Sequence, residues 1–248
     1  MGKTYEALMQ ADREKSKKPE AGMNIESSRI RPIPQGVNIP LPIIEEYHRM
    51  EYKISSWYLE KKSRALVFVC PSEGEGNSTV LTHFGISMAF RGESVLLVDM
   101  NWRRPSIHRF FDLPTGKGSI EWIFDQCTLE EAIQNTYLKN LHVITSGTIT
   151  AGSFPTPPSL FLDYHIKNMK SKANWILIDA PPINASNDAI ALAPKADGVI
   201  MVVKAEKTRW EVAQNARQRI ESGEGNIIGV VLNDRRYYIP EWLYQRLG

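Results

Sequence analysis

Blocks of apolar residues alternate along the chain with blocks in which apolar and polar residues recur at helical spacing. The apolar blocks are short, are bounded by turn residues, and have the length of buried strands. Six strands are predicted on this basis: residues 65–70, 94–99, 141–145, 175–179, 198–203 and 226–233. Because helical segments separate them, the pattern predicts an α/β fold, doubly wound, with a mostly parallel sheet and helices on both faces.

The helical segments are predicted from apolar residues that recur every three or four positions. Helices are expected at residues 43–62, from Ser78 onward, at 159–169 and at 208–221. Thr208 and Glu211 have the spacing of a capping box, so the last helix is expected to begin at Thr208. The charged helix that precedes the first strand is either a solvated cap of the core or a subunit contact.

The N-terminal part of the chain differs in composition from the rest. Residues 4–18 carry a short helical pattern, which predicts either a frayed terminal helix or a helix that docks on another protein. Five prolines between residues 19 and 42 favour extended conformations and predict a linker. We therefore divide the chain into an N-terminal helix (1–18), a proline-rich linker (19–42) and one α/β domain (43–248).

Composition places the chain among ordinary globular proteins. Of its 248 residues, 42% are hydrophobic and 23% are charged. The formal net charge of +2 gives no strong attraction to nucleic acid, which is not expected as a partner. Cys70 and Cys127 lack metal-binding spacing and indicate a reduced, cytoplasmic protein. No apolar run approaches the roughly 18 residues that a membrane-spanning helix needs, and no secretion signal is expected.

A glycine-rich turn follows the first predicted strand and leads directly into a predicted helix. Gly74 and Gly76 lie in this turn, and Ser78 and Thr79 open the helix. Glycines allow backbone N–H groups to approach an anion closely, and the start of a helix adds partial positive charge. The stretch 65–90 therefore predicts a phosphate-binding cradle around which the rest of the chain is organised.

Two positions of this turn depart from the phosphate-loop pattern G-x-x-x-x-G-K-[ST]. Pro71 stands at the first glycine, and Asn77 stands at the lysine. An amide cannot supply the positive charge of that lysine, and phosphoryl transfer depends on electrostatic stabilisation. From the residues alone, the turn is either a working nucleotide site or the remnant of one.

Two acidic residues, Asp99 and Asp179, each end a predicted strand. The carboxyl ends of parallel strands meet at one edge of a sheet, where open α/β proteins bind their ligands. An acid beside a phosphate loop usually serves magnesium or its water, and the structural alternative is a turn or helix-capping role. Arg103 and Arg104 follow the same edge and are assigned a phosphate or subunit-interface role, with surface ion pairing as the alternative.

Three segments together resemble the bacterial tyrosine kinase (BY-kinase) family, phosphate-loop proteins of exopolysaccharide and capsule synthesis and export. They are P-S-E-G-E-G-N-S-T, then L-L-V-D-M-N-W-R-R-P-S-I-H, which is similar to the family motif hydrophobic-D-x-D-x-R-R-P-x-x-H, and I-L-I-D-A-P-P. Their positions are residues 71–79, 96–108 and 176–182. The resemblance extends from about residue 43 to the C-terminus and implies a P-loop NTPase-like fold.

The resemblance implies a role for each matching residue. ATP or ADP would be bound by Gly74, Glu75, Gly76, Asn77, Ser78, Thr79 and Asn233. Mg²⁺ would be held by Ser78 and Asp99, while Asp99 and Asp179 would have the catalytic roles of serving the metal and activating the attacking hydroxyl. Glu46 and Arg49 match part of a helix motif for ring assembly and form the predicted interface set together with Arg103 and Arg104.

Other departures from the family pattern concern catalysis and assembly. Asn101 replaces the second acid of the D-x-D motif, so a charge near the metal is lost in addition to the lysine. Ser72 stands where partitioning-type ATPases carry a signature lysine, and Tyr52 stands at the second arginine of the assembly motif. In place of a long tyrosine cluster the tail carries Tyr237, Tyr238 and Tyr244. We interpret these three as packing residues of the tail.

These departures favour a kinase-like protein of exopolysaccharide biosynthesis that has weak or no catalysis and acts as a regulator or scaffold. Two alternatives are an active ATP-dependent tyrosine autokinase and a partitioning-type ATPase. The expected partner is a membrane polysaccharide co-polymerase or another polysaccharide-biosynthesis protein, with homo-oligomers as a further option. The expected location is the cytoplasm, at the inner face of the cell membrane. ATP or ADP and Mg²⁺ are expected as cofactors if nucleotide binding survives.

Overall fold

The computed structural model describes residues 39–58, 60–148 and 159–235. The predicted N-terminal helix, most of the predicted linker and the three tyrosines of the tail lie outside the described residues. The strands of the described part are β1 (Arg64–Val69), β2 (Val95–Asp99), β3 (Ile133–Asn135), β4 (Leu141–Ile144), β5 (Trp175–Asp179), β6 (Gly198–Lys204) and β7 (Ile227–Asn233). They form one seven-stranded sheet in the order β3-β4-β2-β5-β1-β6-β7.

The pairing of the strands confirms the predicted mostly parallel sheet. β1 pairs parallel with β5 and β6, β2 pairs parallel with β4 and β5, and β6 pairs parallel with β7. The six predicted strands correspond to β1, β2, β4, β5, β6 and β7. Each predicted end lies within one residue of the observed end. The exception is β3, a three-residue strand that runs antiparallel to β4 and was not predicted from the sequence.

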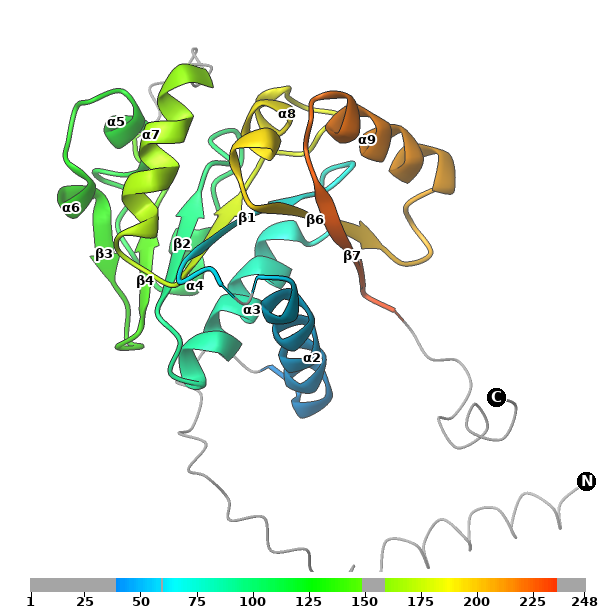
Figure 1. Ribbon diagram of the computed structural model, residues 1–248, viewed down its shortest axis with the longest axis horizontal. Coiled ribbons are helices and arrows are strands. Elements are labelled where there is room, and N and C mark those ends of the chain that lie inside the picture. The colour runs from blue at the N-terminus through cyan, green and yellow to red at the C-terminus, as the bar shows by residue number, and fades with distance from the viewer. Residues whose placement is uncertain (1–38, 59, 149–158, 236–248) are drawn as a thin grey trace, which may run out of the picture. The chain divides into compact units, whose positions relative to one another are not determined.

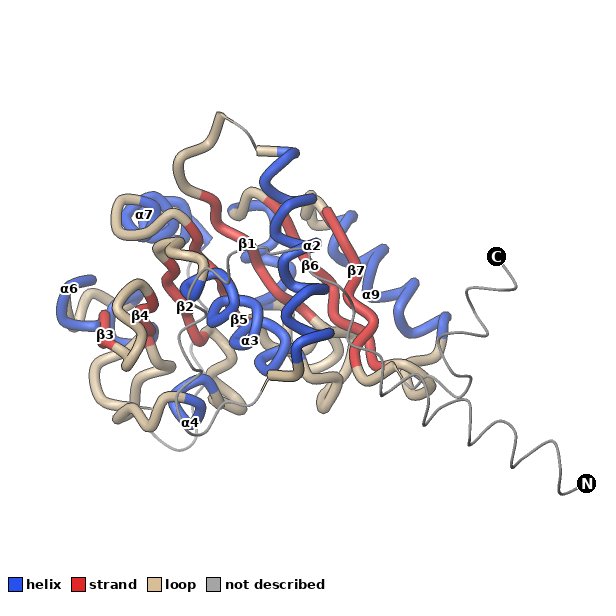
Figure 2. Tube along the Cα trace, turned by 90° about the horizontal axis from the view of Figure 1, so that it is seen from below, coloured by secondary structure: helices blue, strands red, loops and turns tan. Residues whose placement is uncertain are grey.

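Helices cover both faces of the sheet, as predicted. They are α2 (Leu41–Trp57), α3 (Asn77–Phe90), α4 (Ile107–Phe110), α5 (Ser119–Ile123), α6 (Leu129–Ala132), α7 (Ser159–Lys170), α8 (Asp188–Leu192), the 3₁₀ turn η1 (Ala193–Lys195) and α9 (Trp210–Ser222). Figure 1 shows α2 and α3 below the sheet and α7, α8 and α9 above it. In the view of Figure 2, α2 and α3 lie side by side in front of the strands.

Helix α3 leads away from the glycine turn and is enclosed between the sheet and α2. Apolar residues lie on nearly every side of it, including the fully buried Leu81 and Phe84. Gly85 allows the closest approach to the sheet, because a Cβ atom placed there would lie 2.6 Å from Cδ2 of Leu97 on β2. The packing therefore fixes the start of α3, and with it the glycine turn, against the carboxyl ends of the central strands.

Two helices have different ends from those predicted. Helix α2 covers Leu41–Trp57 rather than 43–62, because the chain leaves the helix at Tyr58 and turns toward β1. Helix α9 begins at Trp210, and its N-cap Arg209 makes no side-chain capping bond. The predicted capping box is therefore wrong: the Thr208 hydroxyl instead accepts a hydrogen bond from the backbone N–H of Lys204, at 3.1 Å.

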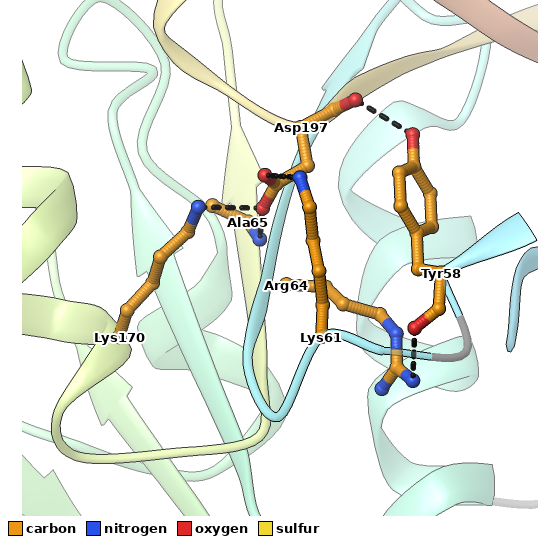
Figure 3. A network of polar contacts seen from close by, with 6 residues as sticks. All are labelled: Tyr58, Lys61, Arg64, Ala65, Lys170 and Asp197. Atoms are coloured by element: carbon orange, nitrogen blue, oxygen red, sulfur yellow. Dashed lines mark hydrogen bonds and ion pairs between the residues drawn. The ribbon is translucent and has the colours of Figure 1, made fainter.

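A polar network around Asp197 joins the end of α2 to the sheet and to α7 (Figure 3). Its carboxylate accepts from Lys61 at 2.6 Å, from the backbone N–H of Ala65 at 2.7 Å, and pairs with Lys170 at 2.7 Å. The Tyr58 hydroxyl donates to the Asp197 carbonyl at 2.6 Å. Burial alone would raise the pKa of Asp197, but the two lysines and the N–H outweigh it and hold that pKa below its usual range.

Replacing the Asp197 carboxylate should destabilise the fold. In Asp197→Asn the two lysines lose their common partner, and we expect the free energy of unfolding to fall by about 1–2 kcal/mol in urea denaturation at pH 7. The loss should shrink as pH falls below about 4, because the stability from a lowered pKa is complete above the unfolded-state value and is lost as pH falls through the folded-state value. Asp163→Asn is the control, since that carboxylate pairs with Lys195 but is largely exposed. Equal effects of the two substitutions would contradict the assignment.

Candidate nucleotide-binding site

The glycine turn has the backbone conformation that a phosphate cradle requires. Gly74 and Gly76 both have positive φ, +77° and +88°, which side chains other than that of glycine rarely tolerate. Gly76 is also the N-cap of α3, so the unpaired N–H groups of the first helical turn face the loop. The local sequence thus places the glycine turn and the N-terminus of α3 together at the carboxyl end of β1.

Asn77 takes the position of the missing lysine and is held by protein acceptors. Its side-chain amide donates to the carbonyl of Phe68 at 2.9 Å and to Oδ1 of Asp179 at 2.7 Å. The residue is only 6% exposed, and its Oδ1 has no hydrogen-bond partner among the described residues. A neutral amide that is bonded to protein acceptors therefore takes the place of the lysine, and it adds no positive charge to the turn.

Ser78 and the two strand-end acids gather at the same point. The Ser78 hydroxyl lies 2.5 Å from Oδ2 of Asp179, while Asp99 and Asp179 are register partners on the adjacent strands β2 and β5. Asp99 accepts three backbone N–H bonds, from Asn101 at 3.1 Å, Ser106 at 3.0 Å and Ile107 at 3.1 Å. The predicted acids are thus brought together, and both are fully buried.

The two carboxyl groups have raised pKa values. Burial raises the pKa of Asp99 to about 6, and its three backbone N–H bonds oppose this. Burial and then the neighbouring Asp99 charge raise the pKa of Asp179 to about 8, against the hydrogen bonds of Ser78 and Asn77. Because the two carboxyl groups titrate as a pair, their raised pKa values favour a pair that shares a proton at neutral pH over one that carries two negative charges.

Asn233, at the end of β7, also contacts the glycine turn. Its side-chain amide donates to the backbone carbonyl of Glu75 at 2.9 Å. A Cβ atom on Gly76 would lie 2.1 Å from this amide nitrogen, so the close approach requires glycine. The predicted nucleotide-binding residue is therefore beside the turn, where it supports the loop.

Several predicted residues do not join this cluster. Thr79 is exposed on the first turn of α3, and Arg104 forms an exposed ion pair with Glu73 at 2.7 Å. Arg103 lines a neighbouring hollow of about 420 Å³ together with Arg219. The predicted assembly residues Glu46 and Arg49 pair with each other at 2.8 Å on the exposed face of α2.

One contact at the turn was not predicted from the sequence. Lys207, in the loop between β6 and α9, places its Nζ 3.5 Å from the position of a Cβ atom on Gly74. No local pattern marks this lysine, because its place depends on how β6 and β7 pair beside β1. The turn therefore has a cationic neighbour, although the lysine of the loop itself is absent.

The residues present fit a nucleotide phosphate better than they fit Mg²⁺. The glycine turn offers backbone donors and the nearby ammonium, which suit a phosphate oxygen. Mg²⁺ prefers oxygen ligands, and Ser78 and Asp99 are the available ones, but the Ser78 hydroxyl is already bonded to Asp179. No group of three His, Cys, Asp or Glu side chains suited to a metal was found in the part of the chain that the structure describes.

The sheet order and the glycine turn define the class of this protein as a P-loop α/β domain. The chain belongs to the family described as cellulose biosynthesis protein BcsQ, which matches residues 66–222. No described helix is both long and apolar enough to cross a membrane.

Its relatives include bacterial tyrosine kinases. Tyrosine-protein kinase YwqD of Bacillus subtilis (strain 168) is 28% identical over 196 residues, which cover 77% of this chain and 81% of the relative. The putative tyrosine-protein kinase CapB of Staphylococcus aureus is 27% identical over 199 residues, covering 77% and 84%. The crystal structure of the chimerical protein CapA2B2 matches with a TM-score of 0.69 and 25% identity, covering 78% and 85%. The predicted resemblance to this kinase family is confirmed.

Proposed function

We propose that this protein is a kinase-fold regulator or scaffold of exopolysaccharide biosynthesis that transfers phosphate weakly or not at all. The observation that supports this most directly is the contact of Asn77 with Asp179 at 2.7 Å. In a phosphate loop the lysine at this position meets the transferring phosphate, whereas here an amide is directed at an acid of the site. The family description and the kinase relatives support the biosynthetic setting.

The acid pair gives the proposal a second line of support. A general base has to be deprotonated to accept a proton from an attacking hydroxyl. Burial and the Asp99 charge raise the pKa of Asp179 to about 8, which favours its protonated form at neutral pH. The carboxyl group of Asp99 is occupied by three backbone N–H groups. Neither carboxylate is therefore arranged to activate a tyrosine hydroxyl.

The proposed partner is a membrane polysaccharide co-polymerase, which would bring the protein to the inner face of the cell membrane. We also propose that copies of this chain assemble into homo-oligomers through α2, and that this contact is weaker than the one with the co-polymerase. Glu46 and Arg49 are retained there, but Tyr52 takes the place of the second arginine and is 78% exposed.

The test is a phosphotransfer assay on the purified full-length chain. With Mg-ATP, labelled phosphate on tyrosine should form at least about 10²-fold more slowly than with a variant that carries Asn77→Lys and Asn101→Asp. Asp179→Asn in the parent is the matched control, because it should leave any trace of contaminating kinase unchanged. Rapid labelling by the parent that Asp179→Asn abolishes would overturn the proposal and support an active autokinase.

A further inference from the structure

The loop between β6 and α9 lies against the glycine turn and carries an exposed lysine. Nζ of Lys207 is 3.5 Å from where a Cβ atom of Gly74 would be, so the ammonium group lies directly beside the turn. Gly74 is the fourth residue of the segment P-S-E-G-E-G-N-S-T, within the part that wraps around a phosphate in phosphate loops.

Several hydrogen bonds fix this loop relative to the turn. The backbone N–H of Ala205 donates to the carbonyl of Asn233 at 2.8 Å, and the side chain of Asn233 donates to the carbonyl of Glu75 at 2.9 Å. Within the loop, the N–H of Thr208 donates to the carbonyl of Lys204 at 3.0 Å, and the Thr208 hydroxyl accepts in return. The position of Lys207 beside Gly74 therefore follows from the end of the sheet, where β6 and β7 lie side by side (Figure 1).

The charge of Lys207 is not neutralised by an ion pair. Among the described residues Lys207 takes part in none, whereas Lys204 pairs with Asp234 at 2.9 Å and Arg104 pairs with Glu73 at 2.7 Å. Glu75, in the turn, is buried, and burial raises its pKa, whereas hydrogen bonds from Thr208, Ser72 and Lys204 and the charge of Lys207 oppose that rise. The ammonium of Lys207 is therefore exposed beside the turn, where it acts on Glu75 through its charge but forms no direct ion pair with it.

We propose that Lys207 binds the phosphate groups of a nucleoside di- or triphosphate and supplies, from outside the loop, the positive charge that Asn77 does not. This inference rests on the proposed function, since it assigns a ligand to the same site. The inference also goes beyond the proposed function, because it predicts that the protein binds nucleotide even though it does not transfer phosphate. The bound nucleotide would then serve as a regulatory ligand.

Calorimetry on the full-length chain tests this proposal, with ADP and Mg-ATP as the titrants. Lys207→Gln should weaken ADP binding by roughly tenfold, because a charge-assisted hydrogen bond to phosphate is lost. Lys204→Gln is the matched control: it removes one charge from the end of β6, next to the loop, but from a lysine already paired with Asp234, and should change affinity by less than about twofold. Lys207→Arg retains the charge and should retain most of the affinity. The salt dependence of binding should also be smaller in Lys207→Gln.

The outcomes separate this inference from the proposed function. Equal ADP affinity of the parent and Lys207→Gln would overturn the role of Lys207. A parent that binds no nucleotide up to millimolar concentrations would also overturn it, while leaving a non-catalytic scaffold in place. If the parent binds nucleotide and transfers phosphate, the proposed function is wrong, but the ratio of affinities still reports on Lys207.

Discussion

A variant that carries Asn77→Lys and Asn101→Asp should bind Mg-ATP on the order of 10²-fold more tightly than the parent, and should gain phosphotransfer activity. The lysine would return a positive charge to the loop, and the aspartate would return a carboxylate next to Asp99. Both substitutions leave in place the two glycines whose positive φ shapes the turn.

The contacts of Asn77 explain why the expected gain is large. Its amide donates to Asp179 at 2.7 Å, and this hydrogen bond only partly opposes the burial and the Asp99 charge that raise the pKa of that acid. An ammonium at this place would lower the pKa of Asp179, because a nearby opposite charge favours the ionised form. The substitution would therefore restore a phosphate ligand and an ionised acid in one step.

Calorimetry with Mg-ATP measures the gain, and the single variants show how it divides between the two positions. Asn168→Lys in α7 is the control, since it adds the same charge away from the turn and should leave the affinity within about twofold of the parent. If the double variant binds Mg-ATP no better than Asn168→Lys, the assignment of the glycine turn as a phosphate cradle is wrong.

The strands and the strand-end acids could be predicted because their signals are local. Apart from Arg64 at the start of β1 and the acids that end β2 and β5, the residues of these three strands are apolar and buried, as expected for central parallel strands. Alternation with helices then restricts the topology, since parallel strands need crossover connections. Asp99 and Asp179 were therefore placed at one sheet edge from the sequence, and the structure makes them register partners.

The features that were missed depend on contacts between distant segments. β3 has only three residues and exists through its pairing with β4. Thr208 has a capping-box pattern, but its hydroxyl bonds the N–H of Lys204 because the loop between β6 and α9 turns back on itself. The position of Lys207 and the end of α2 at Tyr58 likewise follow from tertiary contacts, which leave no local pattern.

The shared proton of the acid pair leads to the second large effect, which concerns stability. Asp179→Asn should stabilise the nucleotide-free protein at alkaline pH. The difference in the free energy of unfolding between variant and parent should be roughly 2 kcal/mol more favourable to the variant at pH 8.5 than at pH 6. Burial raises the pKa of Asp179 to about 8, so the folded parent holds a proton that the unfolded chain releases near pH 4. A raised pKa contributes stability that is lost as pH rises through the folded value. Asparagine is neutral at both pH values, and its amide can still accept from Asn77 and donate to Ser78.

Urea denaturation of the parent and of Asp179→Asn at pH 6 and pH 8.5 measures this difference. The parent should lose stability between the two values, and the variant should lose much less. Asp99 is coupled to Asp179, so the comparison reports on the pair, while the other groups that titrate in this range are common to both proteins and cancel. Asp163→Asn, which changes an exposed acid, should follow the parent. Parallel pH profiles for the parent and Asp179→Asn would show that Asp179 is ionised in the folded protein, and the argument that it cannot act because it is protonated would then fail.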